Sequence, residues 1–173
     1  MYQLKRTQFI KADLQTCWEY FSAPANLHVI TPDYVDFRVR SSVPDKMYEG
    51  LIIHYTIRPI LGIPLKWISE IRTIREQDYF VDEQRKGPYN MWHHEHHFKE
   101  VEGGVEMTDL INYAMPFGFI GKFAHWLFIR KQLESIFDYR IRKVDELFNS
   151  TAGYVESPLQ DSLVPKVARA RKH

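Results

Sequence analysis

Hydrophobic and polar residues alternate in several runs along the middle of the chain. Between residues 36 and 115 these runs show a period of two, which is typical of strands with one buried face. Short breaks rich in Gly or Pro separate the runs, and such short links predict antiparallel neighbours. The expected strands are 2–10, 36–43, 51–58, 65–74, 79–85, 89–101 and 105–115, with 2–10 at an edge of the sheet.

Helical spacing of apolar residues follows the first strand and returns after the last one. Asp13 is typical of a helix N-cap, and the apolar positions that follow it predict a short helix that stops at Pro24. A second short helical turn is expected over residues 25–30. After a Pro-Phe-Gly turn, apolar residues recur in steps of three or four up to Phe148, apart from one longer step across Arg130. This pattern predicts a C-terminal helix about 45 Å long, enough to lie across the whole sheet.

The chain length of 173 residues fits one domain, which we assign to residues 1–148. Residues 149–173 lose the helical pattern, contain two prolines and end in a basic stretch. We interpret them as a C-terminal tail, either a solvated extension or a basic contact patch.

Composition and charge narrow the range of functions. The 23 Lys and Arg residues nearly cancel the 22 Asp and Glu residues, so the net charge of +1 gives no reason to expect a nucleic acid partner. Cys17 is the single cysteine, which excludes an internal disulfide and a cysteine-based zinc site. We expect a cytoplasmic protein, because neither a signal peptide nor an apolar run of the ~18 residues needed for a membrane span is present. The chain is rich in aromatic residues, which often line ligand cavities.

The stretch WHHEHHF at residues 92–98 concentrates four of the eight histidines. Side chains of a strand point alternately to opposite faces, so this stretch splits into two sets. Trp92, His94, His96 and Phe98 form the set expected to face inward, because exposing two large rings to bury a glutamate would be costly. The other set, made up of two histidines and Glu95, is expected to face solvent.

The next strand supports this assignment through its own alternation. With a hairpin turn at Glu102-Gly103, residues whose numbers add to 205 lie opposite each other, which places His96 opposite Asp109 and His94 opposite Ile111. Alternation in the earlier strands places aromatic residues on the same inner face, with Asp82 and Gln84 there as well if Phe80 points inward. Such a mixture of rings, imidazoles and carboxylates is unusual for a dry core and favours a cavity.

The order of these elements resembles the helix-grip fold of the START-like superfamily, also called SRPBCC. The phrases NLHVITP at 26–32, MYEG at 47–50, FVDEQRKGPYNMWHHEHHF at 80–98 and MPFGFIGKFAH at 115–125 are similar to a bacterial SRPBCC family of uncharacterised ligand-binding proteins. Some members of that family are labelled cell-division inhibitors because of a fused epimerase-like domain. The resemblance covers about residues 2–148. It implies an α+β fold in which a curved antiparallel sheet wraps a long C-terminal helix, with two short helices after the first strand.

The resemblance also implies a cavity between the sheet and the long helix, with its mouth near the turn at residues 116–118. A small apolar or amphipathic molecule is the expected partner, and no cofactor or metal is expected. The candidate ligand-binding residues are Tyr55, Trp67, Phe80, Asp82, Gln84, Trp92, His94, His96, Phe98, Asp109, Tyr113 and Phe117.

Three other functions are alternatives to binding of a small molecule. His94 and His96 can share a metal ion, but Asp109 would have to complete the site. Three ligands along one straight strand do not easily reach a single ion, which argues against the outer histidines. An enzyme of cyclase or dehydratase type would use His96 and Asp109 for proton transfer, but no nucleophile motif supports catalysis. The third alternative is a protein-interaction domain with a vestigial cavity.

Overall fold

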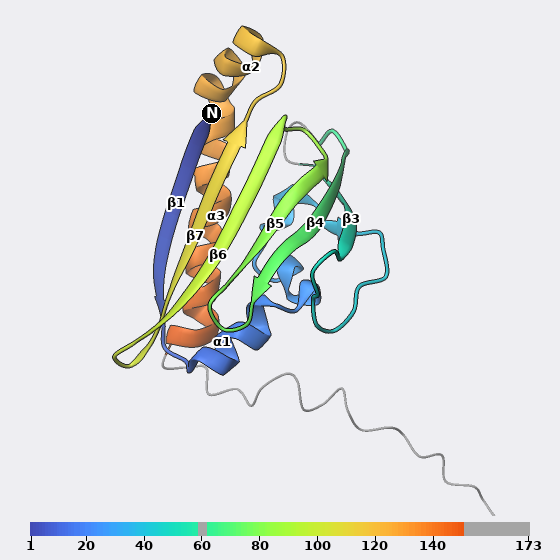
Figure 1. The fold of residues 1–173 in the computed structure, drawn as a ribbon. Coiled ribbons are helices and arrows are strands. Elements are labelled where there is room, and N and C mark those ends of the chain that lie inside the picture. Colours follow the sequence, from blue (N-terminus) through green and yellow to red (C-terminus); the bar gives the residue numbers. More distant parts are fainter. Residues whose placement is uncertain (59–61, 151–173) are drawn as a thin grey trace, which may run out of the picture.

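The computed structural model describes residues 1–58 and 62–150, leaving out the side chains of residues 120, 122, 124 and 125. Within this part of the chain, seven strands form one antiparallel sheet in the order β1-β7-β6-β5-β4-β3-β2 (Figure 1). The strands are β1 (Tyr2–Ile10), β2 (Arg38–Val39), β3 (Ile52–Ile57), β4 (Leu65–Arg75), β5 (Tyr79–Lys86), β6 (Met91–Val101) and β7 (Gly104–Ala114). The first strand lies at an edge of the sheet, as predicted.

The helical segments follow β1 and β7. After β1 come α1 (Leu14–Phe21) and two short 3-10 helices, η1 (Pro24–His28) and η2 (Asp33–Val35). After β7 the chain continues through α2 (Gly118–Ala124), the π-helical turn η3 (His125–Ile129), α3 (Arg130–Val144) and a second π-helical turn, η4 (Asp145–Asn149). This long C-terminal helical segment runs along one face of the sheet, and α1 lies near its C-terminal end (Figure 1). No helix in the described part of the chain has the length and apolar character of a membrane span.

Local sequence signals account for several boundaries. The Asp13 side chain accepts a hydrogen bond from the backbone N–H of Thr16 at 2.8 Å, which caps α1 as predicted. The β6–β7 hairpin turns at Glu102-Gly103, where Gly103 has φ +80° and Val101 pairs with Gly104. The predicted register is therefore confirmed.

The predicted strand over 36–43 is much shorter in the structure, where only Arg38 and Val39 pair with β3. Asp36 has a left-handed backbone with φ 45°, which no extended strand can include. Farther along, the Ser41 hydroxyl accepts a hydrogen bond from the His54 backbone N–H at 3.1 Å, in place of a ladder bond. The alternating pattern in this segment therefore corresponds to a short, irregular edge of the sheet and not to a full strand.

The long C-terminal helix is also less regular than predicted. Its buried positions include Leu133, Phe137 and Val144 of α3, but Phe123 and Leu127 are 61% and 52% exposed. Two causes explain the difference. The segment around α2 projects past the ends of β1 and β7, so no strand lies opposite it (Figure 1). The π-helical turn η3 then rotates the apolar face just before the long step across Arg130.

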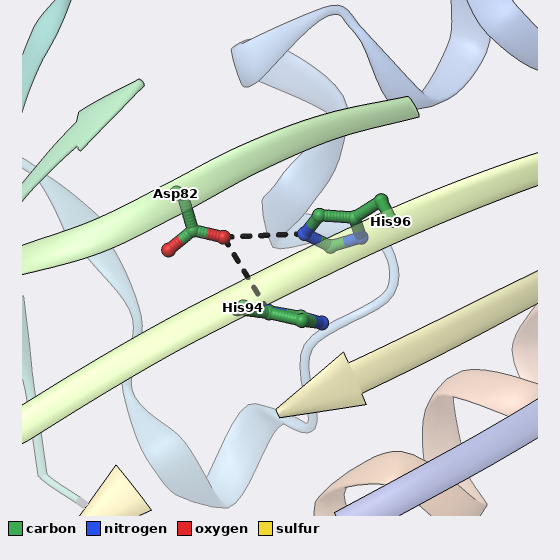
Figure 2. A group of neighbouring side chains, drawn as sticks. All are labelled: Asp82, His94 and His96. Atoms are coloured by element: carbon green, nitrogen blue, oxygen red, sulfur yellow. Dashed lines mark hydrogen bonds and ion pairs between the residues drawn. The ribbon is translucent and has the colours of Figure 1, made fainter. Parts of the chain in front are cut away.

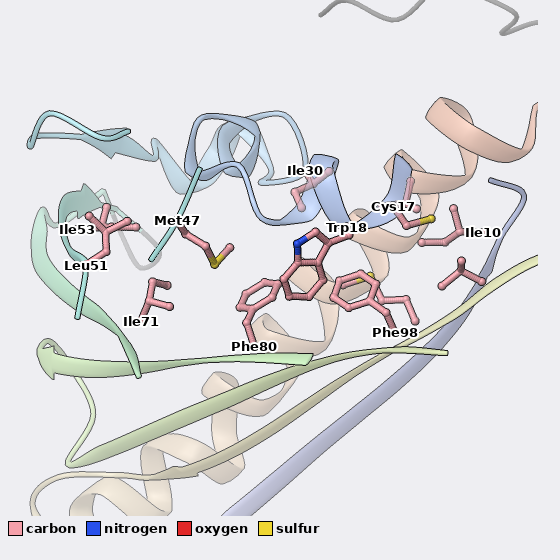
Figure 3. Packing of buried hydrophobic residues seen from close by; sticks show 13 residues of the cluster. Ile10, Cys17, Trp18, Ile30, Met47, Leu51, Ile53, Ile71, Phe80 and Phe98 are labelled. Carbon is pink, nitrogen blue, oxygen red and sulfur yellow. The ribbon is translucent and has the colours of Figure 1, made fainter. Parts of the chain in front are cut away.

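One hydrophobic cluster closes the end of the molecule where α1 lies. Trp18 of α1 is 1% exposed and packs edge-on against Phe80 and Phe98, with ring centroids 6.0 and 5.5 Å apart (Figure 3). Ile10 and Cys17 in the same cluster are completely buried. A second cluster joins Leu133 and Phe137 of α3 to β6 and β7. Between the two clusters the sheet and the helices do not fill all of the space.

Candidate functional site

A cavity of about 240 Å³ lies between the inner face of the sheet and α3. Aromatic side chains of the strands form one wall, and the apolar face of α3 forms the opposite wall. The end of α1 and the segment around η1 close a third side with Tyr20 and Leu27. Most of the lining is apolar, as is usual for small-molecule sites.

The structure places seven of the twelve candidate residues around this cavity. They are Tyr55, Trp67, Phe80, Asp82, Trp92, His94 and His96. Their strands run side by side from β3 to β6, so alternation along each strand correctly selected the face that carries the cavity. Asp82 is among them because β5 turns Phe80 and Asp82 inward together.

The other five candidates lie on or near the same face but outside the cavity lining. The side-chain amide of Gln84 donates to the Tyr89 carbonyl at 2.6 Å and accepts from the Tyr89 N–H at 3.2 Å, so it fastens the β5–β6 connection. Phe98 belongs to the core cluster beneath Trp18. Tyr113 is 3% exposed and packs among aromatic rings of the second cluster.

Phe117 and Asp109 also lie outside the cavity lining. Phe117 is 79% exposed in the turn before α2, where its φ of 63° directs the chain away from the sheet. Asp109 is buried, but it lies behind the two histidines and does not line the cavity. Alternation identifies the inner face of a strand, whereas the packing of α1 and α3 decides which part of that face stays hollow.

Sequence reasoning missed the residues that the helix contributes. Leu133, Phe137 and Arg140 all line the cavity from α3. The signal was present in the sequence, because residues 133, 137, 140 and 144 form one helical stripe and Arg140 is the charged member of it. A cation within an apolar stripe predicts a buried anionic partner.

The polar part of the cavity is a cluster of two imidazoles and a carboxylate. His94 and His96 of β6 are each 5% exposed, and Asp82 approaches them from β5 (Figure 2). Asp82 Oδ2 lies 3.4 Å from His94 Nδ1 and 3.2 Å from His96 Nε2. The two rings lean toward each other, with centroids 3.8 Å apart. All three side chains line the cavity.

Asp109 supports this cluster from the neighbouring strand β7. His94 Nε2 donates a hydrogen bond to Asp109 Oδ1 at 3.0 Å. The same oxygen lies 2.8 Å from His96 Nδ1, although the approach is too oblique for a hydrogen bond. Arg140 of α3 donates to Asp109 Oδ1 at 3.3 Å. The cluster therefore joins β5, β6, β7 and α3 at one point.

Charge pairing outweighs burial at this cluster. Burial alone would raise the pKa of both carboxyl groups. The pKa of Asp109 nevertheless lies well below its ordinary value, because Arg140 and the two histidines stabilise the carboxylate. Hydrogen bonds from His94 and His96 likewise lower the pKa of Asp82. Burial would lower the pKa of His94, but Asp109 and Asp82 raise it above its ordinary value.

Hydroxyl groups offer further polar contacts around the cavity. The Tyr55 hydroxyl and the Ser69 hydroxyl are hydrogen-bonded at 2.7 Å, and Trp67 Nε1 donates to Ser69 at 3.0 Å. The hydroxyl of Tyr20, on the side closed by α1, is buried with no hydrogen-bond partner. A buried donor without a partner requires an explanation, and a bound molecule supplies one.

The outer face of β6 carries the other histidines, as the alternation predicted. His93 Nδ1 lies 2.9 Å from Glu83 Oε1, and His97 Nε2 lies 2.8 Å from Glu95 Oε2. The side chains of His93 and His97 are 35% and 40% exposed. In the described residues these four side chains do not form a group close enough to hold one metal ion.

Large apolar side chains gather on the surface around α2 and η3. Phe119, Phe123 and Trp126 are 81%, 61% and 74% exposed, and the rings of Phe123 and Trp126 lie 6.1 Å apart. Clustered exposed rings of this kind often contact another surface. The alternative of an interaction domain therefore has a structural feature in its favour.

Comparisons with known proteins identify the fold. No protein-family model and no curated protein matches the chain. Among solved structures, the chain is similar to protein Ms6760 from Mycobacterium smegmatis (19% identity, TM-score 0.61, covering 83% of this chain and 88% of that one). It is also similar to protein CV1439 from Chromobacterium violaceum (7% identity, TM-score 0.66, covering 87% and 99%). A third match is the ginseng major latex-like protein 151 from Panax ginseng (14% identity, TM-score 0.58, covering 84% and 95%).

The sheet, the long C-terminal helix and these matches define an α+β protein with a helix-grip fold. The bacterial and plant matches are below 20% identity, so they show the fold and no activity. None of these three names refers to cell division. The function has to be argued from the cavity itself.

Proposed function

We propose that the protein binds a small apolar or amphipathic molecule in the cavity between the sheet and α3. The observation that carries this proposal is a hollow of about 240 Å³ with apolar walls and a buried charged cluster on one side. Close-packed interiors leave few voids larger than a water molecule. A void of this size beside His94, His96 and Arg140 is better explained by a ligand than by imperfect packing.

The cavity indicates the chemistry of the ligand. Its volume lies below the ~300 to 1,000 Å³ of pockets that hold drug-sized ligands, which favours a compact molecule of one or two rings. Stacked Tyr55 and Trp67, with ring centroids 5.9 Å apart, offer flat apolar faces to such a ring. The ligand's polar group, a carbonyl, hydroxyl or carboxylate, would point to His96 and Arg140.

The test is release and rebinding of the ligand. The purified protein is denatured, and the released small molecules are identified by mass spectrometry. Thermal shifts are then measured with those compounds and with a library of compact hydrophobic metabolites. We expect at least one compound to raise the melting temperature. No released compound together with no stabilisation by the library would refute the proposal.

A matched pair of variants locates the binding site. Ile136 of α3 lines the cavity, so Ile136→Trp is expected to fill part of it and abolish the thermal shift. Lys131→Trp places the same indole on the exposed side of α3 and is expected to leave the shift unchanged. Equal binding by Ile136→Trp and the unmodified protein would mean that the ligand binds elsewhere.

The second candidate function is proton transfer to the bound molecule by an enzyme of cyclase or dehydratase type. The observation in its favour is that His96 lines the cavity while its Nδ1 lies 2.8 Å from Asp109. Histidine is the side chain that most often acts as a general base in enzymes. Mass spectrometry of the stabilising compounds after incubation with the protein tests it. Product formation lost in both His96→Ala and Asp109→Asn, with ligand affinity retained, would favour the enzyme over a simple binding protein.

A further inference from the structure

Three potential metal ligands meet at the polar side of the cavity. In the described residues, the group that could hold a metal ion consists of Asp82, His94 and His96. One ligand atom from each of them lies within 4.8 Å of the other two. Asp82 pairs with His94 across β5 and β6, and His96 lies two residues along the same face. Ligands along one straight strand do not easily share an ion, but here the third ligand, Asp82, comes from the neighbouring strand β5 (Figure 2).

The separations between Asp82 and the two histidines suit a tetrahedral ion. In a site with bonds of about 2.0 to 2.1 Å, two ligand atoms lie about 3.3 to 3.4 Å apart. Asp82 Oδ2 lies 3.2 Å from His96 Nε2 and 3.4 Å from His94 Nδ1. Asp82 and either histidine can therefore bind one ion at these separations.

The surroundings favour metal binding by these particular nitrogen atoms. Asp109 Oδ1 lies 3.0 Å from His94 Nε2 and 2.8 Å from His96 Nδ1, the ring atoms that point away from Asp82. Histidine ligands of metals commonly donate a hydrogen bond from their second nitrogen to a carboxylate, as His94 Nε2 does to Asp109. This bond fixes the ring and leaves the first nitrogen free to bind. Arg140 in turn holds Asp109 at 3.3 Å.

The net charge of the cluster favours binding of a cation. The carboxylates of Asp82 and Asp109 and the guanidinium of Arg140 sum to one negative charge in a buried place. A divalent ion reverses this charge. Two imidazoles and one carboxylate suit zinc-like transition metals, whereas Mg²⁺ and Ca²⁺ prefer oxygen ligands alone.

We propose that Asp82 Oδ2, His94 Nδ1 and His96 Nε2 form a site for one divalent transition metal ion of the zinc type. All three side chains line the cavity, so the fourth coordination position faces the space where a small molecule would lie. Water or an oxygen atom of that molecule completes the coordination. Asp109 and Arg140 act as positioning residues that hold the two rings.

The test uses Zn²⁺ and Co²⁺ alone, with no small-molecule ligand. Untagged protein is stripped with a chelator, returned to buffer and titrated with Zn²⁺ by calorimetry. Co²⁺ is added in parallel, because tetrahedral Co²⁺ gives strong visible absorption bands and octahedral Co²⁺ gives weak ones. We expect one ion per chain and a tetrahedral Co²⁺ spectrum.

Variants assign the site to these residues. Asp82→Asn and His96→Ala are expected to weaken Zn²⁺ binding on the order of 100-fold or more, and Asp109→Asn about 10- to 100-fold. The matched controls are His93→Ala and His97→Ala, which remove histidines of the same strand from its outer face and are expected to bind as the unmodified protein does. Circular dichroism checks the fold of each variant, and Asp82→Asn decides if His96→Ala does not fold.

Two results would overturn the metal site. One is the absence of stoichiometric Zn²⁺ binding by the unmodified protein. The other is binding that survives Asp82→Asn and His96→Ala but is lost in His93→Ala or His97→Ala, which would place the ion on the outer face. Neither result bears on binding of a small molecule, because thermal shifts measured in chelator test that function without the metal.

Discussion

The contact between Asp109 and Arg140 allows a quantitative test of how the sheet is joined to α3. The two side chains are 9% and 11% exposed, and the nearest atoms lie 3.3 Å apart. In Asp109→Ala the guanidinium of Arg140 loses its carboxylate partner and stays largely out of water. Removing one partner of a buried ion pair costs about 3–5 kcal/mol, so we expect a loss of that size in the free energy of unfolding.

A second ion pair between the sheet and α3 serves as the control. Arg6 of β1 lies 3.4 Å from Asp138, but their side chains are 27% and 52% exposed. Exposed pairs contribute about 0–1 kcal/mol, so Asp138→Ala is expected to cost no more than that. The two substitutions remove the same chemical group from an arginine partner. They differ in burial and in the hydrogen bond that Asp109 also accepts from His94.

The assay is urea unfolding followed by circular dichroism, in the presence of a chelator so that bound metal does not contribute. The slope of the free energy against urea concentration is expected to stay unchanged, since it reports the surface exposed on unfolding. Adding Arg140→Met to Asp109→Ala removes the unpaired charge and is expected to recover part of the lost stability. Equal costs for Asp109→Ala and Asp138→Ala, or no recovery in the double variant, would refute the reasoning from burial.

Three further predictions test packing and the domain boundary. Burial raises the pKa of Cys17 to about 12 and the residue is fully buried, so the native thiol is expected to resist iodoacetamide for as long as the protein stays folded. Rapid alkylation of folded protein would contradict this. Ile111, 0% exposed in β7, is expected to cost about 2–5 kcal/mol of unfolding free energy when changed to Ala, and a cost below 1 kcal/mol in urea unfolding would show a looser core. The Asn149 side chain donates to the Phe9 carbonyl at 2.9 Å, so a chain ending at Phe148 is expected to be less stable by about 1 kcal/mol than one ending at Ser150, measured by thermal unfolding. Equal melting temperatures would show that the domain ends before Asn149.

The last of these predictions concerns a boundary that the sequence placed at residue 148. Asn149, the first residue of the predicted tail, is the last residue of η4 and also accepts a hydrogen bond from the Lys11 backbone N–H at 2.8 Å. Ser150 is the next described residue, and the rest of the predicted tail, 151–173, lies outside the described residues. The helical pattern is read from apolar residues, so it cannot identify a polar side chain that holds the end of a helix by hydrogen bonds.

The strands were predictable because two local signals agree. Alternation assigned the faces of β6 and β7, and the Gly103 turn fixed their register, so the opposition of His96 and Asp109 followed from numbering alone. Each inward residue then meets another inward residue. A wrong face assigned to one strand would have placed its inward residues opposite outward residues of the next strand.

The contents of the cavity were less predictable, because they depend on how helices pack on that face. Phe98 and Trp92 are equivalent by alternation, but Phe98 lies under Trp18 of α1 while Trp92 lines the cavity. The position of α1 over β6 is a property of tertiary packing that no period in the sequence encodes. The π-helical turn η3 is likewise not encoded by a period in the sequence. Because of this turn, Leu127 lies on the surface and not in the expected core.

The charged cluster itself is poorly explained by stability. Replacing a buried ionic network with apolar residues of similar size is often neutral or stabilising, so stability alone does not account for the charges of Asp109 and Arg140. A near-complete recovery of stability in the double variant Asp109→Ala with Arg140→Met would show that this pair of charges contributes little to stability. The cluster borders a hollow and presents His94 and His96 to it. Its charges are therefore better accounted for by what the cavity binds than by the fold that surrounds it.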